Sequence, residues 1–371
     1  MKVMSHVPLA TNLVRNGNLV EATKVIQSAL LKDGHRPGRG PLSLPPSTMP
    51  GQAGEHRPDR RERRPLSQNL EMLQKLRPPH SRKPVSPDPI PAGATFSKHS
   101  FHSDAGSRTY KLYVPSTGAV SARPLVIMLH GCTQGSDDFA NGTDMNALAE
   151  EFNFLVAYPE QSTSSNKLKC WNWFSLKDQH RGGGEPKIIA GIVQKVVREK
   201  NVDPSRVYIA GFSAGGAMAV VMAATYPELF AAVGVHSGLP YKVASDVPSA
   251  FRAMQNAQGK RGETDNTLRL PPLIVFHGDC DQTVHPANGR RLFDEFRRSF
   301  GRQRDLAQLK ETRHLTHTRT VSYSANEIPL AEHWAIHGGG HAWSGGKSTG
   351  TYTDINGPRA SRELVRFCLL R

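Results

Sequence analysis

Short apolar runs alternate with longer amphipathic stretches through residues 96–371 of this 371-residue chain. Residues 109–114 alternate between polar and apolar side chains, which is typical of a strand with one buried face. Residues 125–129, LVIML, are apolar throughout, as expected of a strand that is covered on both faces. The same reasoning predicts further strands at 154–158, 207–210, 231–235, 273–276 and 332–336, and helices at 145–151, 187–200, 214–226, 289–300 and 361–370.

This alternation of strands and helices predicts an α/β domain over 96–371, with a mostly parallel sheet and helices on both faces. Parallel strands need a crossover connection, and the predicted helices lie between the predicted strands. The segment 238–269 is an insert between two of these strands. We expect it to lie as a cap over one end of the sheet, although it is too polar for a deep apolar lid.

The first 95 residues lack this alternation and divide into two segments. Residues 8–31 carry two apolar stripes at helical spacing around an Asn-Gly-Asn turn signal, which predicts a helical hairpin within 1–34. Residues 35–95 hold 13 of the 27 prolines and few apolar side chains. We interpret them as a disordered linker with one brief helix at 66–76, because little apolar burial is available to offset the entropy of ordering.

Positive charge is concentrated in the same region. The formal net charge is +15, of which +9 belongs to residues 1–98, with an arginine-rich run at 57–64. Such a tail can contact nucleic acid or another anionic surface, but a solvated tether is the favoured interpretation. No stretch approaches the ~20 apolar residues that span a bilayer. The first residues also lack the apolar core of a secretion signal, which favours a cytoplasmic location.

A G-x-S-x-G sequence at 211–215 supplies the clearest chemical signal. Ser213 lies at its centre, between the predicted strand 207–210 and the predicted helix 214–226. In this strand–turn–helix context a strained corner exposes a nucleophilic serine. The N–H groups at the start of the helix also point toward developing negative charge. We therefore predict Ser213 as the nucleophile.

A serine nucleophile needs a histidine base, and the base needs an orienting acid. In this type of fold the acid follows the serine in the chain, after a later strand. Strand 273–276 is followed by Asp279 and Asp281. We prefer Asp281, because Val284 downstream would anchor the loop as it turns back, and Asp279 is the alternative.

The base is expected in a loop after the last strand of the sheet. His341 follows three glycines there, and this loop can bring an imidazole over the sheet edge. His333 and His337 are competitors, but they lie within or at the end of the predicted strand 332–336. His277 leaves a buried strand directly, so we interpret it as structural.

Backbone donors for an oxyanion are expected at two places. One is the amide of Ala214, directly after the nucleophile. The other is in the loop that follows strand 125–129, where Cys132 is the first choice and Thr133 the second. His130 in the same loop is interpreted as structural.

The cysteines and nearby tryptophans leave alternatives open. The four cysteines show no CxxC zinc spacing, so neither a metal nor another cofactor is predicted. Trp171 could line a substrate cleft or simply cover the sheet. Cys132 and Cys170 both fall near the active-site end, and a disulfide between them would require Cα atoms within ~7 Å.

Several blocks in the same order resemble the PHB-depolymerase-type esterases, a family that also takes in feruloyl and acetylxylan esterases. The resemblance covers roughly residues 100–370. The blocks are LHGCTQ at 129–134, VAYPEQ at 156–161, CWNWF at 170–174, the nucleophile region at 202–238, FHGDCDQTVHPANG at 276–289, GGGHAWSGG at 338–346 and GPRASRELVRF at 357–367.

The resemblance implies an α/β-hydrolase fold with a Ser213, Asp281 and His341 triad. It also implies that Cys132 pairs with Cys170 and that Trp343 belongs to the substrate cleft. The implied activity is hydrolysis of carboxylic esters through an acyl-enzyme, first of polyhydroxybutyrate or other hydroxyalkanoate esters and alternatively of feruloyl or acetylxylan esters.

Two features depart from the resembled family. We expect no substrate-binding domain after the catalytic blocks, which argues against attack on crystalline polyester, and the expected cytoplasmic location differs from the largely extracellular location of the family. A function of a different class is tethering or binding through the basic tail. An acyltransferase would use the same acyl-enzyme and differ in excluding water.

Overall fold

The computed structural model describes residues 89–118, 121–257, 270–301 and 306–370. The predicted hairpin, the brief helix at 66–76 and nearly all of the predicted linker lie outside these residues. The strand β1 begins at Thr95, one residue before the predicted start of the α/β domain.

Ten strands form one sheet in the order β1-β2-β4-β3-β5-β6-β7-β10-β9-β8. The six central strands, from β4 to β10 in this order, pair in parallel, and the pairings at both ends are antiparallel. A second, two-stranded sheet pairs β11 with β12. The strands are β1 Thr95–Ser103, β2 Gly106–Val114, β3 Arg123–Leu129, β4 Leu155–Glu160, β5 Val202–Phe212, β6 Ala232–His236, β7 Leu273–Gly278, β8 Leu306–Arg313, β9 His317–Ser324, β10 Pro329–Ile336, β11 Trp343–Ser344 and β12 Thr353–Asp354.

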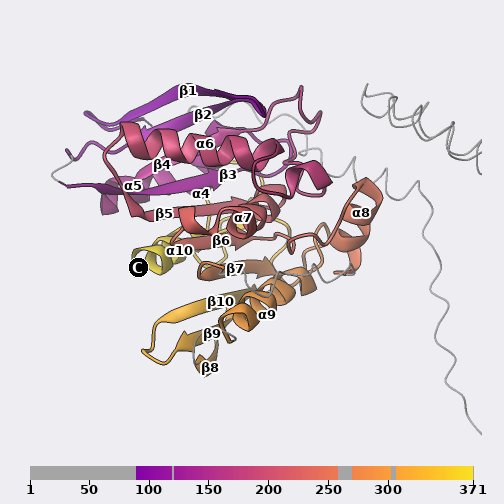
Figure 1. Cartoon of the computed structure of the whole chain (residues 1–371). Coiled ribbons are helices and arrows are strands. Elements are labelled where there is room, and N and C mark those ends of the chain that lie inside the picture. The colour runs from indigo at the N-terminus through magenta and orange to yellow at the C-terminus, as the bar shows by residue number, and fades with distance from the viewer. Residues whose placement is uncertain (1–88, 119–120, 258–269, 302–305, 371) are drawn as a thin grey trace, which may run out of the picture. The chain divides into compact units, whose positions relative to one another are not determined.

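Helices cover both faces of the large sheet (Figure 1). Apolar side chains of α6, α7, α8 and α9 pack in one core cluster with the sheet, and those of α4, α5 and α10 pack in another. The predicted α/β class with a mostly parallel sheet is therefore confirmed. The helices are α4 Ser136–Thr143, α5 Met145–Phe152, α6 Gly184–Glu199, α7 Ala214–Thr225, α8 Val247–Asn256, α9 Ala287–Gly301 and α10 Ala360–Leu369, with short 3-10 turns η2 Leu176–Asp178 and η3 Pro227–Leu229.

Strand β3 shows why the apolar runs form the centre of the sheet. All seven of its residues are buried. Leu125 and Ile127 belong to one core cluster, whereas Val126 and Met128 belong to the other. Because successive side chains of a strand point to opposite faces, the part of a strand that two helical layers cover, here residues 125–129, is apolar at every position.

Three strands at the ends of the sheet were not predicted. β1 exposes or half-exposes every residue, and β8 and β9 carry many polar side chains. A strand at an edge needs only one buried face, or none, so it lacks the continuous apolar run that marked the central strands.

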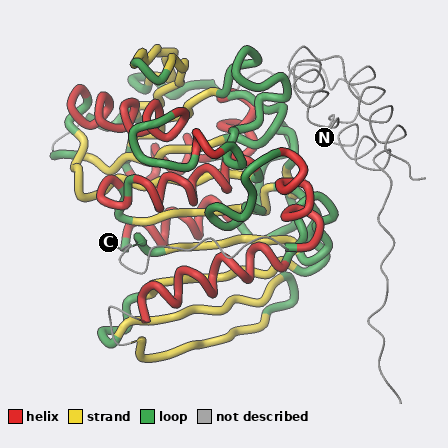
Figure 2. The backbone as a smooth tube through the Cα atoms, turned by 45° about the vertical axis from the view of Figure 1, so that its right-hand side comes forward, coloured by secondary structure: helices red, strands yellow, loops and turns green. Residues whose placement is uncertain are grey.

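The loops after the parallel strands gather at one end of the sheet, where α8 also lies (Figure 2). This follows from the topology, since parallel strands present their carboxyl ends at the same edge. The insert predicted as a cap contains α8, and its residues 258–269 lie outside the described part. Ala250 and Ala253 of α8 pack into the core. Within the described residues, no helix has the length and apolar character needed to span a membrane.

Candidate active site

Ser213 occupies a sharp turn between β5 and α7. Its backbone has φ 54° and ψ −119°, a conformation that L-residues adopt only under strain. The turn brings backbone segments so close that side chains cannot fit beside them. A Cβ atom on Gly215 would lie 2.1 Å from the Leu129 carbonyl oxygen, and one on Gly211 would lie 2.4 Å from the backbone of Gly215. The glycines of the motif are therefore needed for the close approach of β5, α7 and β3.

A continuous hydrogen-bonded chain runs from Ser213 to His341 and Asp281. The His341 Nε2 atom lies 2.9 Å from Ser213 Oγ, and His341 Nδ1 lies 2.7 Å from Asp281 Oδ2. Because the carboxylate can only accept, His341 carries its proton on Nδ1 and accepts from the serine hydroxyl through Nε2. Ser213 is 8% exposed, so the nucleophile lies just below the protein surface.

The environment of Asp281 keeps this carboxylate ionised. Its Oδ1 atom accepts hydrogen bonds from the amides of Thr283 and Val284, both at 2.9 Å. Burial by itself raises the pKa of Asp281. The contacts with His277 and His341 outweigh burial and hold the pKa well below its ordinary value.

The other acid and histidine candidates take structural positions. Asp279 is exposed and accepts a hydrogen bond from the Gly338 amide at 2.7 Å, so it fixes the start of the loop that carries His341. His277 Nε2 donates to the Val284 carbonyl at 2.9 Å and lies 3.5 Å from Asp281 Oδ2, the oxygen that also binds His341. His333 is buried within β10, and His337 is exposed and contacts Thr318.

The amides of Cys132 and Thr133, the two candidates for an oxyanion donor in the loop after β3, differ in whether they already make a hydrogen bond. The Thr133 amide donates to the Leu168 carbonyl at 2.6 Å, which occupies it. Among the described residues, neither the Cys132 amide nor the Ala214 amide has a hydrogen-bond acceptor. Both remain available to an incoming oxygen. The choice of Cys132 over Thr133 thus agrees with the hydrogen bonding of the loop.

Cys132 forms a disulfide with Cys170, with Cα atoms 4.2 Å apart. The pairing implied by the family resemblance is present. It joins the loop after β3 to the loop after β4, two segments separated by 38 positions in the sequence.

Trp171 is buried, so its predicted place in the substrate cleft is wrong, and the structural role that the sequence also left open agrees with the structure. Its side chain is 0% exposed, and its Nε1 atom donates to the His130 carbonyl at 3.1 Å. His130 is buried as well, and its Nε2 atom accepts from the Gln161 amide at 3.0 Å. Burial lowers the pKa of His130 to about 4, so the ring stays neutral and can accept. Both side chains therefore support the loop that carries Cys132.

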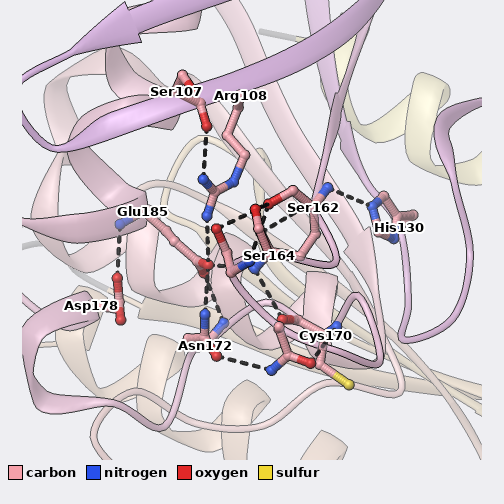
Figure 3. A network of polar contacts seen from close by, with 12 residues as sticks. Ser107, Arg108, His130, Ser162, Ser164, Cys170, Asn172, Asp178 and Glu185 are labelled. Atoms are coloured by element: carbon pink, nitrogen blue, oxygen red, sulfur yellow. Dashed lines mark hydrogen bonds and ion pairs between the residues drawn. The ribbon is translucent and has the colours of Figure 1, made fainter. Parts of the chain in front are cut away.

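Glu185 lies at the centre of a buried polar network next to this loop (Figure 3). Its carboxylate accepts from Asn172 through both the backbone amide at 2.7 Å and the side chain at 2.8 Å. It pairs with Arg108 at 3.1 Å and also accepts from the Gln161 side chain. Burial, followed by the charge of Asp178, raises the pKa of Glu185.

The network extends from Glu185 to the disulfide. The Gln161 side chain donates to the Cys170 carbonyl at 3.0 Å, while its backbone amide contacts His130. Sequence reasoning missed this set of residues. The available signal was a glutamate in the first turn of a helix next to the Cys-Trp-Asn-Trp block.

Trp343 is also buried, and this corrects its predicted place in the substrate cleft. It is 3% exposed, and its Nε1 atom donates to Ser361 Oγ at 3.0 Å. Its ring packs against Phe139 and His236. A side chain enclosed in this way supports the loop that carries the base.

A second contact between loops was not predicted. Asp138 of α4 accepts from the Thr351 amide at 2.8 Å and from Gln134 Nε2 at 2.9 Å. The Thr133 hydroxyl lies 3.2 Å from the Tyr352 hydroxyl. These bonds connect the loop after β3 to the segment that follows His341. Within the described ranges, no group of three or more His, Cys, Asp or Glu side chains is arranged to hold a metal ion.

A central parallel sheet, a serine at a strained strand–helix turn, and an acid and a histidine after later strands define the α/β-hydrolase fold. The comparison with protein families narrows this class. Residues 108–313 match the family described as esterase PHB depolymerase, and the chain belongs to this family. The resemblance seen in the sequence blocks is thereby confirmed.

Two curated relatives illustrate the range of the family. Poly(3-hydroxyalkanoate) depolymerase C of Paucimonas lemoignei is 35% identical over 256 residues, which cover 65% of this chain and 60% of the depolymerase. Probable acetylxylan esterase A of Aspergillus fumigatus is 31% identical over 217 residues, which cover 54% of this chain and 57% of that esterase. The match thus spans about three fifths of the length of these relatives.

Solved structures agree on the fold. The acetyl xylan esterase of Aspergillus awamori superposes with a TM-score of 0.56 at 25% identity and covers 66% of this chain and 94% of its own. An S-formylglutathione hydrolase of Agrobacterium tumefaciens gives a TM-score of 0.50 at 16% identity, with 76% and 97% coverage. The second likeness shows a shared fold alone.

Proposed function

We propose that this protein is a serine esterase that hydrolyses carboxylic esters through an acyl-enzyme on Ser213. The observation that carries the proposal is the hydrogen-bonded chain from Ser213 Oγ to His341 and Asp281. His341 Nε2 removes the hydroxyl proton as Ser213 attacks the ester carbonyl, and then gives this proton to the leaving alcohol. A water molecule activated by His341 releases the acid in the second half of the reaction.

The orienting acid and two backbone amides also contribute to this mechanism. Asp281 holds the Nδ1–H tautomer of His341 and stabilises the imidazolium that forms when the serine proton is transferred. The tetrahedral oxyanion is bound by the amides of Cys132 and Ala214, which have no acceptor among the described residues. Removing one oxyanion donor costs about 100- to 1,000-fold in kcat in a comparable site. The held position of the Cys132 loop is therefore part of catalysis.

The activity is tested with p-nitrophenyl acetate and butyrate. The wild type is expected to release p-nitrophenol, and Ser213→Ala is expected to lose the activity by a factor of about 10⁴ or more. Ser205→Ala is the matched control, because Ser205 is an exposed serine on the opposite end of the same strand. An inactive wild type, or an active Ser213→Ala variant, would refute the esterase proposal.

For the substrate, we propose a hydroxyalkanoate ester of the polyhydroxybutyrate type. The similarity to a poly(3-hydroxyalkanoate) depolymerase supports this substrate, because that relative is 35% identical to this chain and the acetylxylan esterase is 31% identical. The second candidate is an acetyl or feruloyl ester on a plant polysaccharide. The superposition on an acetyl xylan esterase over 94% of that chain favours this alternative.

A comparison of kcat/KM values separates the two substrates. The proposal predicts a value for 3-hydroxybutyrate trimer at least about 10-fold above the values for acetylated xylo-oligosaccharide and feruloyl arabinose, which corresponds to ~1.4 kcal/mol of differential transition-state binding. The reverse order would assign the enzyme to the polysaccharide esters.

We also propose that the arginine-rich run at 57–64 acts as a solvated tether without a nucleic-acid partner. Its charge supports the competing hypothesis of contact with an anionic surface. Replacing Arg60, Arg61, Arg63 and Arg64 with Gln in the full chain tests this hypothesis. Unchanged binding to DNA and to anionic vesicles at low salt supports the tether, and a salt-dependent loss of binding in the variant contradicts it.

A further inference from the structure

His236 contacts both halves of the catalytic arrangement. It is the last residue of β6 and pairs in register with Phe212, the residue directly before the nucleophile. Its backbone carbonyl accepts a hydrogen bond from the Ser213 amide at 2.9 Å. Its ring Nε2 accepts a hydrogen bond from the Ser344 amide at 3.0 Å, three residues after His341.

We propose that His236 is a positioning residue that fixes the distance between the nucleophile turn and the loop carrying the base. This inference rests on the proposed esterase function. One side of the residue holds Ser213 through the backbone, and the other side holds the His341 loop through the ring. A shift of about 1 Å between a nucleophile and its base costs on the order of 100-fold in rate.

The ring of His236 is enclosed in one orientation. It is 1% exposed and lies nearly parallel to two aromatic rings, Trp343 at 5.2 Å and Phe276 at 5.9 Å between ring centroids. Its Nδ1 atom lies 3.2 Å from Ser237 Oγ. Because Nε2 must accept from the Ser344 amide, the proton is on Nδ1. The buried Trp343 thus has a role as one wall of the site that orients His236.

The function of His236 requires a neutral ring. Burial, and then the neighbouring His277 and His341, lower the pKa of His236 to about 3, while Asp281 opposes this shift. A protonated ring would have no lone pair to accept from Ser344. It would also place a positive charge near the imidazolium that forms on His341 during acyl transfer. A neutral acceptor is the form compatible with both demands.

Two substitutions separate the acceptor from the ring. His236→Phe retains an aromatic ring between Trp343 and Phe276 but removes the acceptor for the Ser344 amide. His236→Gln removes the ring but can present an amide oxygen near the position of Nε2. His333→Phe is the matched control, since His333 is another buried histidine, lies on β10 and has an Nε2 atom without a partner in the described part of the chain.

Two experiments are done on each full-length variant. Steady-state kinetics with p-nitrophenyl butyrate give kcat and KM, and diisopropyl fluorophosphate gives a second-order rate of inactivation. The inactivation rate reports the reactivity of Ser213 without ester turnover. We expect His236→Phe to lower kcat and the inactivation rate together by about 10-fold or more, with KM within about twofold. His236→Gln should recover most of both rates, and His333→Phe should leave both unchanged.

The inference is overturned if His236→Phe has the kcat and the inactivation rate of the wild type. It is overturned as well if His236→Phe and His236→Gln both keep the wild-type melting temperature but lose kcat by the same factor. It is also overturned if the loss appears only in KM. Failure of the esterase proposal looks different, because the wild type would then be labelled by the fluorophosphate but release no p-nitrophenol. In that case the labelling rates of the same variants still decide the role of His236.

Discussion

At the residue scale, the roles of similar side chains are decided by their partners. Asp279 and Asp281 are two positions apart in one loop, yet Asp279 is exposed and binds a backbone amide, whereas Asp281 is buried and binds His341. Only the second carboxylate can orient the base. The distinction predicts a large difference between the same substitution at the two positions.

Asp281→Asn is expected to lower kcat by about 10³- to 10⁴-fold, because an amide at this place stabilises neither the Nδ1–H tautomer nor the imidazolium. Asp279→Asn retains an oxygen acceptor for Gly338 and should lower kcat by less than about 10-fold. Steady-state kinetics with p-nitrophenyl butyrate measure both effects. Equal losses, or a larger loss for Asp279→Asn, would move the acid to Asp279.

The sequence was sufficient to place Ser213, Asp281 and His341 in one site, because each stands in a local context with few alternatives. It misplaced Trp171 and Trp343, since an aromatic side chain near a site can face the substrate or the core, and local sequence does not tell which. It also gave no role to His236, because its two hydrogen bonds come from the amides of Ser213 and Ser344, which are distant in the chain.

At the scale of elements, the loops of the site are tied to one another. The disulfide, the Glu185 network and the Asp138 contacts all act on the loop after β3 that carries Cys132. This loop must keep a backbone amide aimed at an oxygen that appears only during the reaction. Preorganisation of this kind is what makes such donors effective.

The double variant Cys132→Ser/Cys170→Ser is expected to lose about 3–4 kcal/mol of unfolding free energy, as the closing of a loop of this length predicts. Its kcat should fall about 10-fold or more, because the Cys132 amide loses its tether. Urea unfolding and p-nitrophenyl butyrate kinetics measure the two effects. Cys280→Ser is the control, as Cys280 is exposed and unpaired. Full stability and activity of the double variant would exclude a role for the disulfide.

Glu185→Ala is expected to destabilise the protein by about 3–5 kcal/mol, because it leaves Arg108 buried without its partner. The lost acceptor also frees Gln161 and Asn172, so activity should fall at temperatures where the variant is still folded. Lys195→Ala, which breaks the exposed pair with Glu199, should cost less than about 1 kcal/mol. Thermal and urea unfolding give both values, and similar losses for the two variants would contradict the prediction.

Elements with continuous apolar runs were predictable, whereas the edge strands and the contacts between loops were not. Residues 125–129 are apolar throughout, and such a run is typical of a central strand because helices cover both of its faces. The hydrogen bonds from Asn172 and Arg108 to Glu185 span 13 and 77 positions, and the bond from Thr351 to Asp138 spans 213. Local periodicity carries no information about such pairs.

At the scale of the whole molecule, several histidines are buried in the neutral state. The pKa values of His130, His236 and His333 are lowered to about 4, 3 and 3, in each case mainly by burial. In the unfolded chain a histidine has a pKa of about 6.5. Below that pH the unfolded state binds protons that the folded state excludes, so these residues lower the unfolding free energy as the pH falls.

Each of these histidines is expected to remove about 1.4 kcal/mol of stability per pH unit between about pH 6 and pH 4. His333→Phe isolates one contribution, because it keeps a buried ring that cannot titrate. The slope of unfolding free energy against pH should be smaller by about this amount in the variant. Urea unfolding at pH 7, 6 and 5 provides the measurement, and identical slopes for wild type and variant would show that His333 is not buried neutral.

The most direct test of the central claim is to locate the residue that a covalent serine reagent modifies. After reaction with diisopropyl fluorophosphate, tryptic digestion gives a peptide of residues 207–242, which contains Ser213 and Ser237. Fragmentation by mass spectrometry is predicted to place one diisopropylphosphoryl group on Ser213. No such group is expected when the protein has first been inactivated with an excess of a phosphonate ester inhibitor. A group on Ser237 or on another residue, or no modification of the folded protein, would contradict the assignment of Ser213 as the nucleophile.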